Sequence, residues 1–261
     1  MYDNDLEVFR RECQVESGEW LEEEDNFKKW ADPNDHSVRL FWLQGIPGAG
    51  TFSASREQNI MITRKGKTVI SSVIIYRKRA ADCNVLFAFP RHDKPTCSSA
   101  LKILHSLIFQ VLLDNQLLQP IMHEAYTSNH RQIMSSLEFT AELFADLVKE
   151  IGPVFIVVDG VDEMAELERR LLLKTLTGQL QACEDLKLLV SSRWERDIAL
   201  ALGNDVPSTR VDHKNTPDIE AYIKKQTNDW LPELQSYGAD DSMCSEVKLL
   251  LKSISSKAEG L

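Results

Sequence analysis

The run from Val154 to Asp159 places five consecutive apolar residues directly before an acid. An apolar run without polar alternation is typical of a strand that is buried on both faces of a parallel sheet. Strands that alternate with helices indicate βαβ units, so we expect an α/β fold, a sandwich with a mainly parallel sheet between two layers of helices. The other segments with strand character cover 38–44, 84–90, 186–193 and 208–213.

Helical periodicity and capping signals fill the intervals between these strands. Ser98 or Ser99 is expected to cap one helix, and the spacing from Ser135 to Glu138 to cap the next. The expected helices cover 67–82, 98–116, 135–152, about 166–182 and 242–257, and one more starts at Thr216 and Pro217.

The pattern divides the chain into three parts. Residues 1–36 are acidic, with apolar residues at roughly helical spacing, and are predicted to form a helical lead-in. Residues 37–213 are predicted to form the main domain, and 214–261 a helical extension that is truncated at its end.

The chain carries a formal net charge of −10, with 43% hydrophobic and 27% charged residues. Such a composition is typical of a globular protein and argues against nucleic-acid binding, which needs clustered cations. The one basic stretch, Arg77 to Arg79, is expected to be a solvated helix face. The five scattered cysteines are expected to be free thiols. With a charged N-terminus and no apolar run of membrane-spanning length, we expect a cytoplasmic protein.

A glycine-rich loop follows the first of these strands. Gly45 and Gly50 bracket a G-x-x-x-x-G pattern that also contains Gly48. In a phosphate-binding loop a lysine comes next and reaches the outer phosphates, and the hydroxyl after it binds Mg²⁺. Here sixteen residues intervene before Lys67 and Thr68. The glycines alone are equally compatible with a tight turn between a strand and a helix.

Acids follow the strand that ends at Asp159, where open α/β sheets bind their ligands. An aspartate at this position is suited to hold Mg²⁺, and Asp162 or Glu163 can orient an attacking water. The alternative is an acid-rich helix start that is favoured by the helix dipole.

A third polar strand end comes at Ser191, Ser192 and Arg193. A hydroxyl there can sense a γ-phosphate, and the arginine can supply positive charge beside it. An ordinary surface arginine is the alternative.

In this order and spacing the chain resembles the NACHT-type P-loop NTPases of the STAND class. The resemblance covers about 14–230 and is strongest to the nephrocystin-like N-terminal domain of fungal NACHT and ankyrin-repeat proteins. The stretches that carry it are GEWLEEEDNFKKWADPN, RLFWLQGIPGAG, KTVISSVIIY, VFIVVDGVDEM, LKLLVSSRWERDI and NTPDIEAYI.

The resemblance implies a P-loop NTPase fold that binds ATP or GTP with Mg²⁺ and acts as a switch in signal transduction. It also implies a possible homo-oligomer formed through this domain, with effector and repeat regions absent from this chain. By position it assigns Gly45, Gly48, Gly50, Lys67 and Thr68 to the nucleotide, Thr68 and Asp159 to Mg²⁺, Asp162 or Glu163 to the water, and Arg193 to the sensor.

The segment 51–66 is the departure from that family pattern. Its removal restores an unbroken G-x-x-x-x-G-K-T and keeps the reading frame, and codons for its two ends can contain GT and AG. We interpret it as a short intron that has been translated in the gene model. If it is instead a genuine insertion, closing the loop costs only about 2–3 kcal/mol, so the fold survives while nucleotide affinity falls.

Two other functions stay open from the sequence. One is a non-catalytic α/β scaffold or interaction domain that has lost nucleotide binding. The other is a small-molecule kinase of the P-loop class, which is disfavoured because no Arg-rich lid is evident.

Overall fold

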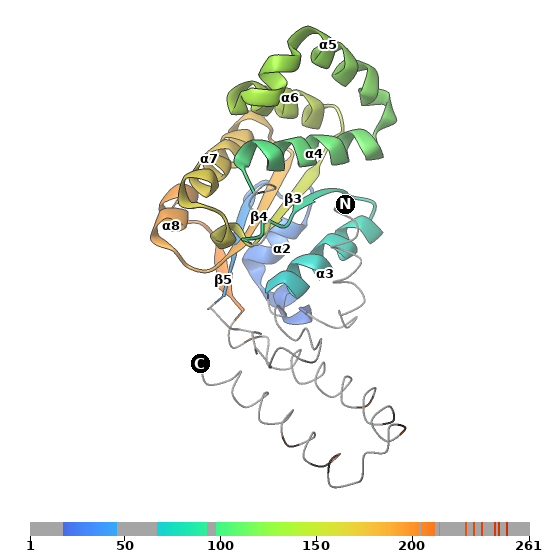
Figure 1. The fold of residues 1–261 in the computed structure, drawn as a ribbon. Coiled ribbons are helices and arrows are strands. Elements are labelled where there is room, and N and C mark those ends of the chain that lie inside the picture. The colour runs from blue at the N-terminus through green and yellow to red at the C-terminus, as the bar shows by residue number, and fades with distance from the viewer. Residues whose placement is uncertain are drawn as a thin grey trace.

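The computed structural model describes residues 18–45, 67–92, 98–203, 205–211 and 214, together with single positions at 228, 232, 236, 243, 245 and 249. Its strands form one parallel sheet in the order β2-β3-β4-β1-β5 (Figure 1). The strands are β1 (Leu40–Gln44), β2 (Asn84–Ala88), β3 (Val154–Asp159), β4 (Leu186–Ser192) and β5 (Ser208–Arg210).

The strand register brings the polar strand ends to one edge of the sheet. Asp159 at the end of β3 pairs with Ser191 on β4, and Ser192 pairs with Gln44 at the end of β1. The acids at the end of β3, the Ser-Ser-Arg at the end of β4 and the glycine that follows β1 therefore lie side by side, as expected for a parallel sheet.

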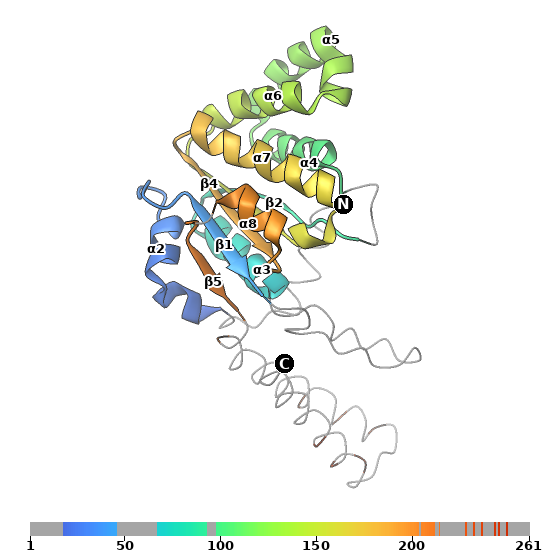
Figure 2. The same ribbon diagram turned by 90° about the vertical axis from the view of Figure 1, so that its left-hand side faces the viewer.

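Helices cover both faces of the sheet, and the expected three-layer α/β architecture is confirmed (Figures 1 and 2). Successive side chains of β3 point to opposite faces: Ile156 belongs to one core cluster, and Phe155 and Val157 belong to the other. An all-apolar strand is stable here because both faces are covered.

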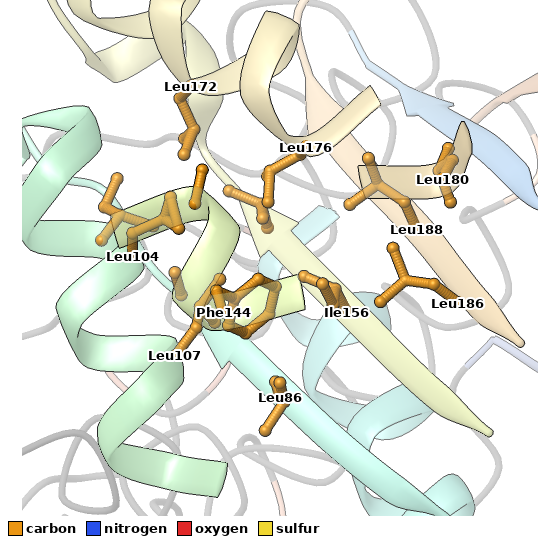
Figure 3. Close-up of a cluster of buried hydrophobic side chains, with 14 of the residues drawn as sticks. Leu86, Leu104, Leu107, Phe144, Ile156, Leu172, Leu176, Leu180, Leu186 and Leu188 are labelled. Carbon is orange, nitrogen blue, oxygen red and sulfur yellow. The ribbon is translucent and has the colours of Figure 1, made fainter. Parts of the chain in front are cut away.

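The larger core lies between the sheet and α4 (Ala100–Asp114), α6 (Leu137–Lys149), α7 (Glu166–Ala182) and α8 (Arg196–Leu202). Figure 3 shows Phe144 of α6 and Leu176 of α7 on the same side of the sheet as Ile156 of β3, and all three belong to this core. A further helix, α5 (Gln119–Ser135), packs on α6 and lies far from the strands (Figure 1).

The opposite face is covered by η1 (Glu19–Glu23), a 3₁₀ turn, by α2 (Asp25–Ala31) and by α3 (Lys67–Ala80). Trp30 of α2 is fully buried, donates its indole N–H to the carbonyl of Leu188 at 3.1 Å, and meets the Phe155 ring edge-on at 5.3 Å. The part of the N-terminal lead-in that the structure describes is thus packed directly on the sheet.

The Lys187 side chain holds the N-terminal segment in place by hydrogen bonds to backbone carbonyls of that segment. The residue is 2% exposed, and its ammonium donates to the carbonyls of Lys29 at 2.8 Å and Asp35 at 2.6 Å, and also to that of Asp32. Burial lowers the pKa of Lys187, and the nearby acids Asp35 and Asp32 oppose this shift.

The expectation that Arg77 to Arg79 form a solvated face is wrong. Arg77 pairs with Glu22 at 2.7 Å, and Lys78 donates to the Ala31 carbonyl. The guanidinium of Arg79 lies over the Phe87 ring at 4.9 Å. Arg77 and Lys78 thus hold the N-terminal segment against α3, and Arg79 packs on β2.

One helix cap differs from the expected one, and two helices were not expected. Ser99 caps α4 as expected, but α6 is capped by Ser136, whose hydroxyl accepts from the Phe139 N–H, because α5 continues through Ser135. The helices α5 and α8 were not expected from the sequence: α5 buries only Ile133, and α8 spans just seven residues.

The helices expected from Thr216 and over 242–257 lie outside the described residues, except for single positions at 228, 243, 245 and 249. Cys83 and Cys183 are free thiols, and the other three cysteines also lie outside. Among the helices that are described, none combines the length and apolar character that crossing a membrane would require.

Candidate functional site

Lys67 is the first residue of α3, and its side chain folds back over the end of β1. The ammonium donates to the Gly45 carbonyl at 3.2 Å. Its stem lies so close to the Gly45 backbone that a Cβ at that position would meet Lys67 Cδ at 2.9 Å. The structure therefore brings Gly45 and the displaced lysine together, although 46–66 separate them and are not described.

Thr68 connects the start of α3 to the end of β3. Its hydroxyl donates to Asp159 Oδ2 at 2.6 Å, and the Ser71 hydroxyl, one helical turn further along, donates to Oδ1 at 3.1 Å. A hydroxyl that gives its proton to a carboxylate keeps its lone pairs for a cation. Both oxygens of Asp159 are thus oriented from α3.

Asp159 is a buried carboxyl in an apolar strand end. Burial raises its pKa, while hydrogen bonding and the charge of Lys67 oppose the shift. The Ser191 hydroxyl lies beside it in the register and favours the charged form. It does not meet the geometry of a hydrogen bond, and it is a buried polar group without a partner among the described residues. A buried acid in these surroundings gains from a cation placed next to it.

The two serines at the end of β4 differ in their contacts. The Ser192 hydroxyl accepts from the Trp42 indole N–H at 2.8 Å and donates to the Arg193 carbonyl at 2.8 Å, so it serves the backbone turn. The Ser191 hydroxyl, by contrast, makes no hydrogen bond within the described part of the chain.

Asp162 and Arg193 form a second group beside the first. The Asp162 carboxylate accepts from the Arg193 backbone N–H at 3.1 Å and lies 3.2 Å from its Nε. The aspartate side chain is 7% exposed, and the arginine side chain is 48% exposed. The turn after β3 is thereby tied to the turn after β4.

Gly160 makes this turn possible. Its backbone has φ +86°, a left-handed conformation that favours glycine, and an added Cβ would lie 3.1 Å from the Pro90 carbonyl. The chain then enters η4 (Val161–Glu163), and the Glu163 carboxylate accepts from the His92 N–H at 3.2 Å.

Most of the site residues expected from the sequence come together in space. One group holds Gly45, Lys67, Thr68 and Asp159; the neighbouring turns hold Asp162, Glu163 and Arg193. Gly48 and Gly50 lie outside the described residues.

Ser71 was missed by the sequence reasoning. Its signal was a hydroxyl in the apolar run VISSVII, three residues after Thr68 and so on the same helix face.

The donor set of the first group fits Mg²⁺. This ion prefers oxygen ligands and keeps several waters, so one carboxylate, one hydroxyl and substrate phosphates suffice. In the described part of the chain there is no group of three or more His, Cys, Asp or Glu side chains that could hold a metal unaided. Thr68 and Asp159 are thus suited to a metal that arrives with an anionic ligand.

Comparison with protein families identifies one match. The model of the family described as nephrocystin 3, N-terminal, matches residues 16–56 and 61–193. The two matched stretches cover more than half of the chain, and the break between them falls inside 51–66. A comparison with curated proteins gives no match.

Two solved structures show similarity at low sequence identity. The Aeropyrum pernix ORC1 protein in complex with DNA has a TM-score of 0.43 and 14% identity, over 84% of this chain and 54% of that one. The Walker-type ATPase PABY2304 of Pyrococcus abyssi has a TM-score of 0.45 and 11% identity, over 90% of this chain and 66% of that one. The chain thus spans between half and two thirds of these proteins.

Proposed function

Because the chain belongs to the nephrocystin 3 N-terminal domain family, we propose that it is a nucleotide-binding signalling module of the NACHT and STAND type. Its ligand would be ATP or GTP with Mg²⁺. The observation that carries this proposal is the convergence of Lys67 on Gly45 and of Thr68 on Asp159 at one edge of the sheet.

Each of these residues has a defined task in nucleotide binding. Lys67 supplies a cation at the start of α3, where the helix dipole also favours an anion. Thr68 and Asp159 would hold Mg²⁺, which when bound neutralises charge on the outer phosphates. Cation binding would also relieve the cost of keeping Asp159 buried and charged.

For hydrolysis we assign the water-positioning role to Glu163. The alternative acid, Asp162, has both carboxylate oxygens directed at Arg193, whereas Glu163 is anchored through the His92 N–H. Arg193, the most exposed of these groups, would then sense the γ-phosphate. Replacement of Glu163 should therefore stop hydrolysis and leave binding in place.

We further propose that the segment 51–66 weakens nucleotide binding in the chain as written. Gly45 and Lys67 are in contact, but a phosphate-binding loop also needs consecutive backbone N–H groups that point at the phosphate, and these normally come from the few residues between the first glycine and the lysine. A translated intron is our explanation for the segment, and sequencing of mature transcripts tests it: if all of them encode 51–66, the explanation is wrong.

The melting temperature of the purified chain, measured with and without Mg-ATP or Mg-GTP, tests the function. A ligand that binds only the folded state raises the melting temperature, and at 100 times its Kd it adds about 2.7 kcal/mol. A rise that disappears in Lys67→Ala supports nucleotide binding. No rise with either nucleotide, for this chain and for the chain lacking 51–66, favours the scaffold alternative.

Self-association through this domain is a further part of the proposal, and it rests on the family resemblance. Sedimentation velocity with and without Mg-nucleotide tests it. A single monomeric species under both conditions contradicts it.

A further inference from the structure

Arg169 of α7 lies outside the proposed nucleotide site, and its guanidinium is buried among three segments of the chain. The side chain is 10% exposed. Its Nε donates to Asp197 Oδ2 at 2.7 Å and its Nη2 to Asp197 Oδ1 at 2.9 Å, a bidentate pair. Nη2 also contacts the Glu195 carboxylate.

The third contact of Arg169 reaches the acidic turn. Its Nη1 donates to the backbone carbonyl of Asp162 at 3.4 Å. The carboxylate of the same Asp162 binds Arg193, which lies two residues before Glu195. The contacts therefore form a closed ring that runs from Asp162 to Arg193, along the chain to Glu195, and back through Arg169.

This ring limits how the two turns can move. Arg193 is 48% exposed, so its own surroundings restrain it weakly, and an exposed ion pair contributes little rigidity. Charge-assisted bidentate bonds are stronger and directional. To shift the turn after β4 relative to α7, the bidentate pair with Asp197 and the contact with Glu195 must break. The turn after β3 is tied to the same guanidinium by the 3.4 Å bond to the Asp162 carbonyl.

We propose that Arg169 is a positioning residue, which fixes the turn that carries Arg193 against the turn that carries Asp162 and Glu163. It does not touch the nucleotide; it sets where the sensor and the water-positioning acid stand. This inference rests on the proposed function for its catalytic consequence. A residue that only joins α7 to α8 would leave the rate of hydrolysis unchanged in a folded variant.

The test compares Arg169→Gln, Arg169→Lys and the matched control Arg170→Gln in the full chain. Arg170 is the next residue on α7 and, among the residues that the structure describes, makes only a 3.8 Å surface ion pair with Glu166. We expect Arg169→Gln to lower kcat by about ten- to a hundredfold with KM for Mg-nucleotide changed less than about threefold, since loss of orientation affects the chemical step. Arg169→Lys should recover part of kcat because it keeps the charge, and Arg170→Gln should match the unmodified chain.

Amide hydrogen exchange without nucleotide provides an independent readout. In Arg169→Gln, peptides over 160–164 and 192–196 should exchange at least about fivefold faster, while β3 and β4 keep their protection. If this variant fails to fold, Glu195→Gln replaces it: it removes one carboxylate of the ring and leaves the bidentate pair, so a smaller change in the same direction is expected.

These measurements distinguish failure of the positioning role from failure of the proposed function. Unchanged kcat and unchanged exchange in folded Arg169→Gln, or in Glu195→Gln if it takes its place, overturn the positioning role. Unchanged exchange overturns it even where hydrolysis is too slow to detect. Faster exchange together with a lower kcat supports it. Absence of Mg-nucleotide binding in the unmodified chain overturns the proposed function, and with it the catalytic role of Arg169.

Discussion

Replacement of Asp159 by Asn should stabilise the unliganded protein and abolish its response to Mg²⁺-nucleotide. Asp159 is a fully buried carboxyl whose pKa is raised by burial. Asparagine has nearly the same shape but carries no charge, and the Thr68 and Ser71 hydroxyls can rotate to serve its amide. The same change removes the carboxylate that would hold the metal.

The magnitude follows from two opposing terms. Taking a carboxylate out of water costs several kcal/mol after relaxation. Against this cost, the hydrogen bonds from the Thr68 and Ser71 hydroxyls, at 2.6 and 3.1 Å, each stabilise the charged carboxylate by about 1.5–3 kcal/mol. We expect a net cost on the order of 1 kcal/mol in the unliganded protein, so Asp159→Asn should raise the melting temperature by about 2–4 °C.

The stability gained by Asp159→Asn should depend on pH, and the raised pKa of Asp159 sets the direction of that dependence. The folded protein holds the Asp159 proton more tightly than the unfolded chain, whose pKa is near the ordinary value of 3.8. The stability contributed by this group is therefore complete below pH 3.8 and is lost as pH rises through the folded pKa. The advantage of Asp159→Asn should be largest at pH 8 and should shrink toward pH 4.

Differential scanning calorimetry without nucleotide measures the change in melting temperature, and Asp162→Asn serves as the control. The Asp162 carboxylate accepts from the Arg193 backbone N–H at 3.1 Å and forms an ion pair with its Nε at 3.2 Å, so its replacement weakens a favourable pair and should lower the melting temperature. Opposite signs for the two variants at pH 8 are expected. The reasoning would be refuted if Asp159→Asn lowered the melting temperature as much as Asp162→Asn does.

Three further predictions concern separate contacts. Gly45→Ala should displace the Lys67 stem, which an added Cβ would meet at 2.9 Å, and weaken Mg-nucleotide binding at least about tenfold in calorimetric titration. Glu163→Gln should keep the Kd for Mg-nucleotide within about threefold and lower the hydrolysis rate at least about a hundredfold; a normal rate of phosphate release contradicts its assignment. Trp30→Phe removes the indole bond to the Leu188 carbonyl and should lower the free energy of unfolding in urea by about 1–3 kcal/mol, whereas no change would show that this bond does not stabilise the fold.

The sheet could be predicted from the sequence because its signals are local. A run such as Val154 to Asp159 is apolar at every position, and only burial on both faces accommodates it. Strand ends in a parallel sheet share one edge, so the order of polar residues along the chain already placed Asp159 near Ser191 and Arg193.

The helices that escaped prediction lack such a local signal. The sequence of α5 is largely polar, and the helix is bent at Asn129, where φ is −132°. Most of its stability must come from packing on α6 rather than from its own periodicity. The seven residues of α8 are too few for a repeating apolar face to be recognised.

The site residues that could not be predicted from the sequence are defined by tertiary contacts. Ser71 reads as an ordinary helix residue until β3 places Asp159 against it. Arg169 reads as a surface arginine in a charged helix, and only the fold brings Asp162, Glu195 and Asp197 around it. Likewise, no pattern in the sequence could say whether Lys67 returns to Gly45 across 46–66.

Calorimetric titration of Mg-ATP and Mg-GTP into two forms of the protein tests the nucleotide site most directly. One form is the chain as written, and the other lacks 51–66, so that Gly50 is followed by Lys67. We predict that the shortened form binds one of the nucleotides at least about tenfold more tightly, and that Lys67→Ala abolishes this binding in both forms. Equal affinity of the two forms contradicts the proposed impairment, and the absence of binding in both contradicts the nucleotide site itself.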